Sequence, residues 1–124
     1  MGWLLEIIQL PLRRKQRSAL KSRYDVTKDS FVRSMADDPL DEAVASFIWD
    51  FLVDAAVVID FKPLPDDNFL RMYGLAEEDL DDDLILRTFE NLQLPPPSSS
   101  TIEQVGEIKC PQDIMRLVRL SRSQ

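Results

Sequence analysis

The apolar side chains between residues 40 and 55 constrain the fold of this chain more than any other sequence feature. They recur at the i, i+3, i+4 and i+7 spacing that places them on one face of an α-helix. Asp38 can cap the start of this helix, and Pro39 suits its first position. We predict a helix from Leu40 to about Ala56 as the centre of the core, burying Leu40, Ala43, Val44, Phe47, Ile48, Phe51, Leu52 and Ala55.

The remaining patterns predict more helices and no sheet. A helix is expected over residues 78–92, and another begins at Pro111. Between the first two helices, one of Asp66, Asp67 and Asn68 should cap a short turn that Gly74 ends. Three consecutive prolines within residues 94–101 interrupt the chain. At 124 residues, we expect an all-α domain over residues 36–124, preceded by a distinct segment over residues 1–35.

The segment of residues 1–35 is basic, whereas the chain that follows is acidic. It holds eight Lys and Arg against three acids, for a net charge of +5, while residues 36–95 hold three against sixteen, for −13. Residues 1–23 begin with apolar side chains and continue with basic ones, an order that suits contact with the surface of an anionic membrane. Packing on the domain and an oligomer contact are the alternatives. The membrane-contact candidates are Trp3, Leu4, Leu5, Ile7, Ile8, Arg13, Arg14, Lys15 and Arg17.

Composition argues against several classes of function. The chain has no His, which removes the commonest general base and metal ligand, and its single Cys110 cannot form an intrachain disulfide. We therefore expect no enzyme activity and a reducing compartment, the cytoplasm, with peripheral contact to the inner face of the membrane. The acidic body should repel nucleic acid.

Six acids occur among the seven residues 77–83, where the second helix should begin. Acids favour a helix start, but i,i+4 like-charge pairs such as Glu78 with Asp82 oppose it. Two explanations for these acids remain open: they form a solvent-exposed face of the helix, or they bind a basic protein partner. The spacing of Asp79, Asp81, Asp83 and Glu90 matches an EF-hand loop, yet Leu84 stands where that loop needs Gly. We therefore expect no resident metal.

Two stretches of the sequence resemble the acyl carrier protein family: DDNFLRMYG at residues 66–74 and IKCPQDIMRLV at residues 108–118. The resemblance implies a small four-helix bundle. In that family, a Ser at the start of the second helix carries phosphopantetheine. Here the equivalent residue is Glu77 or Asp79, and a carboxylate cannot take that group, so no cofactor is expected. The chain is also similar to a bacterial family of carrier-like domains of unknown function, which have acids at that position.

The resemblance implies a non-enzymatic interaction module that binds a basic partner, such as an enzyme of lipid or polyketide biosynthesis, through its acidic second helix. Two alternatives stay open: a functional carrier modified at an atypical Ser, and a membrane-recruited acidic inhibitor of the immunity type. The expected protein-binding residues are Glu77, Glu78, Asp79, Asp81, Asp82, Asp83, Arg87 and Glu90.

Overall fold

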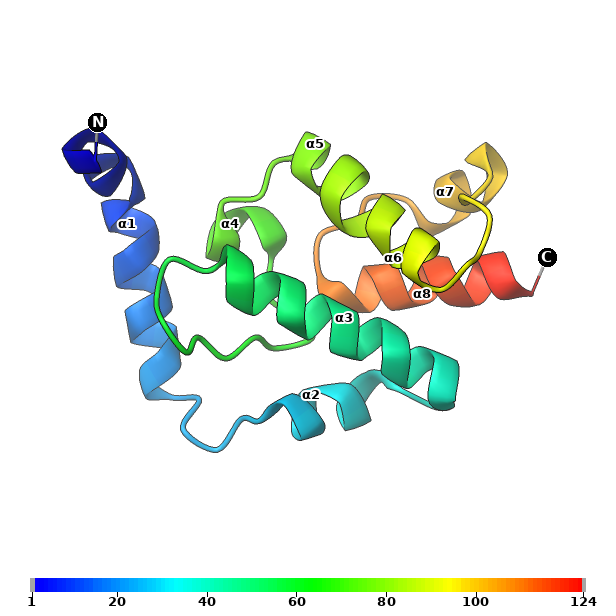
Figure 1. The fold of residues 1–124 in the computed structure, drawn as a ribbon, viewed down its shortest axis with the longest axis horizontal. Coiled ribbons are helices and arrows are strands. Elements are labelled where there is room, and N and C mark those ends of the chain that lie inside the picture. The colour runs from blue at the N-terminus through cyan, green and yellow to red at the C-terminus, as the bar shows by residue number, and fades with distance from the viewer. Residues whose placement is uncertain (1, 124) are drawn as a thin grey trace.

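The computed structural model describes residues 2–123, with side chains from Gln9 onward, and every regular element in that range is helical. The prediction of an all-α fold is confirmed. Figure 1 shows α3 across the middle of the molecule, with α1 at one edge and α8 on the opposite side. The elements are α1 (Gly2–Lys21), α2 (Lys28–Met35), α3 (Pro39–Ala55), α4 (Phe69–Tyr73), α5 (Glu77–Asp79), η1 (Leu80–Ile85), α6 (Leu86–Asn91), α7 (Ser99–Val105) and α8 (Pro111–Arg122).

Helix α3 begins as predicted and forms the centre of the core, in contact with α2, α6 and α8. The Asp38 carboxylate accepts a hydrogen bond from the Asp41 amide at 2.8 Å, and Pro39 occupies the first turn. The predicted buried face is only partly correct: Ala43 is exposed, and four of the other predicted residues are only half-buried, namely Leu40, Phe47, Phe51 and Ala55. Because α2 and α8 both cover α3, the buried arc is shifted. Its members are Asp41, Val44, Ala45, Ile48 and Leu52.

Asp41, in the first turn of α3, is buried and joins α3 to the last helix. Arg119 donates to its Oδ2 from Nη2 at 2.9 Å and from Nε at 3.2 Å, and Arg122 donates to Oδ1 at 3.3 Å. The side chain of Asp41 is 2% exposed. These charge-assisted bonds supply the partners that a buried carboxylate requires.

Helix α2 lies inside the segment of residues 1–35 and was not predicted. Thr27 and Ser30 form a reciprocal capping box at its start, in which each side chain bonds the other residue's amide. Phe31 and Met35, one helical turn apart, are buried against α3. The Phe31 ring lies 5.2 Å from the ring of Trp49, between their centroids.

The second predicted helix is a continuous helical run over residues 77–91 that contains a π turn. The amide of Leu86 donates to the carbonyl of Asp81, five residues back, as in a π-helix. Leu80 and Ile85, also five residues apart, are both buried, together with Leu84 and Phe89. The run therefore presents its apolar side chains to the core and leaves Asp81 and Asp82 exposed. Leu92, the last residue of the predicted helix, lies just beyond the helix end and is half-buried.

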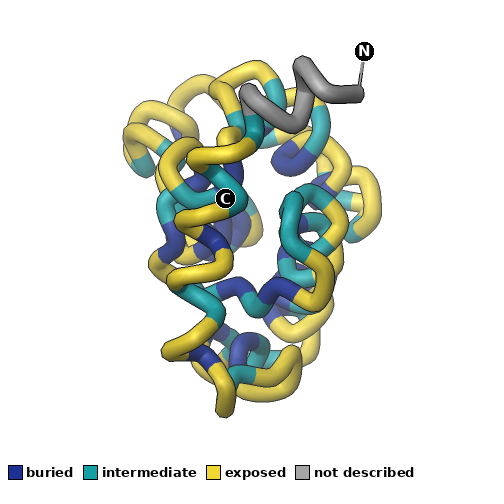
Figure 2. The backbone as a smooth tube through the Cα atoms, turned by 90° about the vertical axis from the view of Figure 1, so that its left-hand side faces the viewer, coloured by how far each residue is buried: buried dark blue, intermediate teal, exposed yellow. Residues whose placement is uncertain are grey.

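The short α4 follows the predicted signals, since Asn68 accepts from the Arg71 amide at 2.8 Å and Gly74 ends the helix with φ 68°. Gly74 also lies close to α1: a Cβ at this position would be 3.3 Å from Leu12 Cδ2. Figure 2 shows buried backbone on the inner sides of the helices and exposed backbone around the outside.

A buried ion pair ties the end of α1 to the loop before α4. Arg23 binds both carboxylate oxygens of Asp67, at 2.8 and 2.6 Å, and lies over the ring of Phe61 at 5.3 Å. Asp67 also accepts from the Tyr73 hydroxyl at 2.8 Å and the Leu64 amide at 2.9 Å. Burial raises the pKa of Tyr73, and the charge of Asp67 raises it further. Of the three predicted cap candidates, Asn68 caps α4, and Asp67 instead binds these buried partners.

Gln16 makes a second polar connection from α1 to the body. Its side chain is fully buried, its amide nitrogen donates to the Met72 carbonyl at 2.8 Å, and its oxygen accepts from the amides of Val57 and Val58. These contacts satisfy a polar side chain that would otherwise be costly to bury. The second half of α1 and the residues just after it thus pack on the domain through Leu12, Gln16 and Arg23.

Candidate functional site

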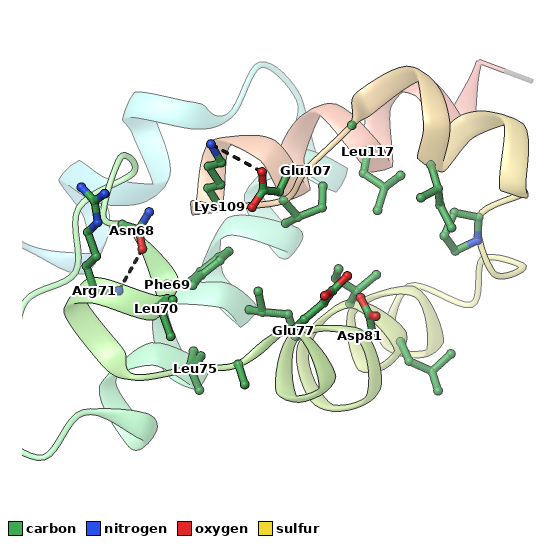
Figure 3. A pocket seen from close by; sticks show the side chains of 18 of the residues that line it. Asn68, Phe69, Leu70, Arg71, Leu75, Glu77, Asp81, Glu107, Lys109 and Leu117 are labelled. Carbon is green, nitrogen blue, oxygen red and sulfur yellow. Dashed lines mark hydrogen bonds and ion pairs between the residues drawn. The ribbon is translucent and has the colours of Figure 1, made fainter. Parts of the chain in front are cut away.

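A groove of about 910 Å³ lies among α4, the helical run of residues 77–91, α7 and the start of α8. Its floor is apolar. Phe69, Leu80 and Leu117 are buried there, and Ile85 and Ile108 line it between them. Figure 3 shows Phe69 and Leu117 approaching the groove from opposite sides. Such an apolar concave surface with polar groups at its edge is the common form of a binding site.

Three large aliphatic side chains remain exposed around this groove. Leu70 on α4 is 64% exposed, Leu86 at the start of α6 is 39% exposed, and Ile102 on α7 is 47% exposed. All three line the groove, although they come from separate elements. Isolated exposed leucines are ordinary, but their gathering around one concavity indicates a surface that another apolar surface could cover.

Charged side chains lie at both ends of the groove. Glu77 and Asp81, one helical turn apart, extend toward the groove from the helical run, and Arg71 and Lys109 lie at the other end (Figure 3). Lys109 forms an ion pair with Glu107, with 3.5 Å between Nζ and Oε2. Among the described side chains, neither Glu77 nor Asp81 lies within ion-pair distance of a basic group. Their charge is therefore available to a ligand.

The structure divides the eight predicted protein-binding residues rather than placing them on one surface. Glu77 and Asp81 line the groove, whereas Glu78 and Asp82 are exposed beside it without lining it. Asp79 is half-buried and accepts from the Ala76 amide at 2.9 Å, so it helps to hold the start of the helix. The other three do not line the groove: Asp83 is half-buried, and Arg87 and Glu90 are exposed.

The EF-hand spacing does not produce a loop. Leu84 is fully buried within the helical run, and the acids around it are held by that helix. Across the described part of the chain, no group of three or more Cys, Asp or Glu side chains is placed to hold a metal ion. The positions of the acids within residues 79–90 are set by the helix, whose apolar face packs on the core.

Asp113 holds the chain at the Lys109 end of the groove. Its Oδ2 accepts from the Lys109 amide at 2.8 Å and the Cys110 amide at 3.2 Å. Partial burial alone would raise the pKa of Asp113, but these bonds and the guanidinium of Arg116 outweigh it and lower that pKa. Burial raises the pKa of the Cys110 thiol. This thiol belongs to the residue that precedes α8 and makes no side-chain cap bond to the helix amides.

The membrane-contact candidates are described only in part. The side chains of Trp3, Leu4, Leu5, Ile7 and Ile8 lie outside the described residues. Of the basic candidates, Arg14, Lys15 and Arg17 are exposed and Arg13 is half-buried. In the described part of the chain, no helix has the length and apolar character needed to cross a membrane.

Sequence reasoning found the acids but missed the groove. Leu70, Leu86 and Ile102 were assigned to no site, because each is an ordinary apolar residue within its own segment. Only the arrangement of the four segments brings them together. The chain was compared with family models, curated proteins and solved structures, and none of them matches it.

Proposed function

We propose that this chain is a non-enzymatic, acyl-carrier-like interaction module that binds a basic amphipathic helix of a partner protein in the groove between α4 and α7. The observation that carries the proposal is the combination of three exposed aliphatic side chains with two unpaired carboxylates, Glu77 and Asp81, around one apolar concavity. An amphipathic helix is bound in such grooves through apolar side chains one or two turns apart.

The chemistry of the groove favours a helix whose apolar stripe is flanked by Lys or Arg. Leu70, Leu86 and Ile102 would bury against the stripe, which contributes affinity roughly in proportion to the apolar area removed from water. Glu77 and Asp81 would contact the basic flank, and their charge would orient the partner and raise its rate of association. The exposed Glu78 and Asp82 extend the same field beyond the groove.

The resemblance to acyl carrier proteins supports the same kind of function. In a carrier-like four-helix bundle made of α3, residues 77–91, α7 and α8, the start of the second helix would be both the docking surface and the attachment site. Here Glu77 or Asp79 occupies the attachment position. A carboxylate there preserves the negative charge that docks partners and removes the hydroxyl that would carry phosphopantetheine. An enzyme of lipid or polyketide biosynthesis remains the partner that this resemblance suggests.

A labelled synthetic helix can test the proposal. We would measure by fluorescence anisotropy the binding of a peptide with Leu at i, i+3, i+4 and i+7 and Lys elsewhere, against a peptide with Glu in place of Lys. The chain should bind the Leu/Lys peptide and not the Leu/Glu peptide, with an affinity that falls as salt screens the charges.

Variants of the chain then locate the binding. Glu77→Lys with Asp81→Lys should weaken binding at least about tenfold, which corresponds to roughly 1.4 kcal/mol. Asp25→Lys with Asp54→Lys makes the same change in net charge at exposed acids away from the groove, and should weaken it much less. Leu70→Asn with Leu86→Asn should also reduce it. Equal effects of the two charge variants would contradict the proposal.

A further inference from the structure

Helix α1 carries an exposed basic stripe on the side that does not contact the body. Arg14, Arg17 and Lys21 follow Leu10 at i+4, i+7 and i+11, so the four side chains lie along one face of the helix. All four are exposed, and Leu10 is 42% exposed. Gln16, on the opposite side of the helix, and Arg23, just after its end, are both buried against the body. We call Leu10, Arg14, Arg17 and Lys21 the basic stripe.

The basic stripe has no acidic partner within the described part of its own chain. The ion pairs there include none of its three cations and none of the acids of residues 77–83. Gln16 and Arg23 hold α1 on the other side of α4, at the edge of the molecule seen in Figure 1. The stripe of one molecule therefore points away from the acids of the same molecule.

We infer that the groove and its acids bind the basic stripe of a second copy of this chain. This inference rests on the proposed function and names its partner. Every feature required of that partner is present in α1: it is helical, it carries cations on successive turns, and an apolar side chain, Leu10, begins the same face. No second protein is needed to supply the complementary charge.

The dimensions of the two surfaces agree. From Arg14 to Lys21 the stripe extends about 10 Å along its helix, at 1.5 Å per residue. The exposed acids from Glu77 to Asp82 extend about 8 Å along theirs by the same measure. Leu10 lies one turn before the first cation, so it can reach the aliphatic edge of the groove, at Leu70 or Leu86, while the cations contact the acids. The stripe and the groove are different patches, so each molecule can give one contact and receive another.

Charge reversal on each surface provides a direct test. The stripe variant carries Arg14→Glu, Arg17→Glu and Lys21→Glu, and the groove variant carries Glu77→Lys, Asp81→Lys and Asp82→Lys. The full-length wild type should associate in sedimentation velocity at low salt and dissociate at high salt. Each variant alone should associate at least about tenfold more weakly, because like charges then face one another. Far-UV circular dichroism checks that both variants remain helical.

Mixing the two variants is the decisive measurement. Their charges are complementary again, so an equimolar mixture should form a complex that neither variant forms alone. A wild type that stays monomeric at low salt, or a mixture that stays dissociated, would overturn the inference. If the Leu/Lys peptide still binds the groove in that case, the proposed function stands and only the second copy is excluded as its partner. Binding of the wild type, but not the stripe variant, to phosphatidylserine vesicles without self-association would instead assign the stripe to a membrane.

Discussion

Replacing Asp67 by Asn should destabilise the fold more than almost any other change of similar size. Asp67 is 3% exposed and accepts four hydrogen bonds, two of them from Arg23, which is 8% exposed. Asn keeps the shape of the side chain but removes its charge and turns an N–H group toward one of these donors. Arg23 is then left as a buried cation without a counter-charge.

The expected loss follows from the burial of the pair. Removing one partner of a buried ion pair costs about 3–5 kcal/mol. A domain of this size is stable by about 5–15 kcal/mol, so much of its margin would be lost. With a urea m-value of about 1–3 kcal/mol/M, the unfolding midpoint should fall by roughly 2 M. Urea titration followed by far-UV circular dichroism measures this shift.

The pair of Lys28 and Asp50 provides a matched control. Its N–O distance is 2.9 Å, but the two side chains are 43% and 63% exposed. Asp50→Asn removes a charge in the same way, and should cost about 0–1 kcal/mol, because water already solvates both groups. If Asp67→Asn lowered the free energy of unfolding by no more than Asp50→Asn does, the buried pair would not hold α1 to the body in the way argued above.

Two further changes test the same region. Because burial and Asp67 raise the pKa of Tyr73 above its ordinary value of 10.0, the unfolded state should ionise first as the pH passes about 10, and stability should fall above that pH by up to about 1.4 kcal/mol per unit. Tyr73→Phe should remove this loss of stability above pH 10. Urea midpoints of the wild type and the variant, measured on either side of pH 10, would show the difference. If the two midpoints fell in parallel with pH, Tyr73 would not be the cause. Gly74→Ala should cost about 1–2 kcal/mol, since φ is 68° and the new Cβ would lie 3.3 Å from Leu12 Cδ2, and an unchanged melting temperature would contradict the strain.

Helix starts were the part of the fold that local sequence predicted best. Asp38 and Asn68 cap their helices, and Pro39 and Pro111 lie in first turns, as their positions indicated. These signals act over three or four residues, so no tertiary contact is needed to read them. The unpredicted α2 has such a signal as well, in Thr27 and Ser30, inside the segment of residues 1–35.

Buried faces were harder to predict, because they depend on what packs against each helix. The spacing of apolar residues in α3 indicated Phe47 and Phe51 as core residues, yet both are half-buried, while the polar Asp41 is buried. Neighbouring helices shifted the buried arc of α3, and Arg119 and Arg122 of α8 made the buried carboxylate of Asp41 tolerable. Neither fact is visible from the residues of α3 alone.

The sequence by itself determined that this chain is helical, that its charges are segregated, and that six acids stand at the start of one helix, since these depend on residue type and local spacing. Only the tertiary structure decided which acids share a surface with apolar groups: it placed Glu77 and Asp81 beside three exposed aliphatic residues. The groove is lined by four successive segments between Asn68 and Leu117, which fold back on one another. Its physical basis is packing between helices, which no local pattern contains.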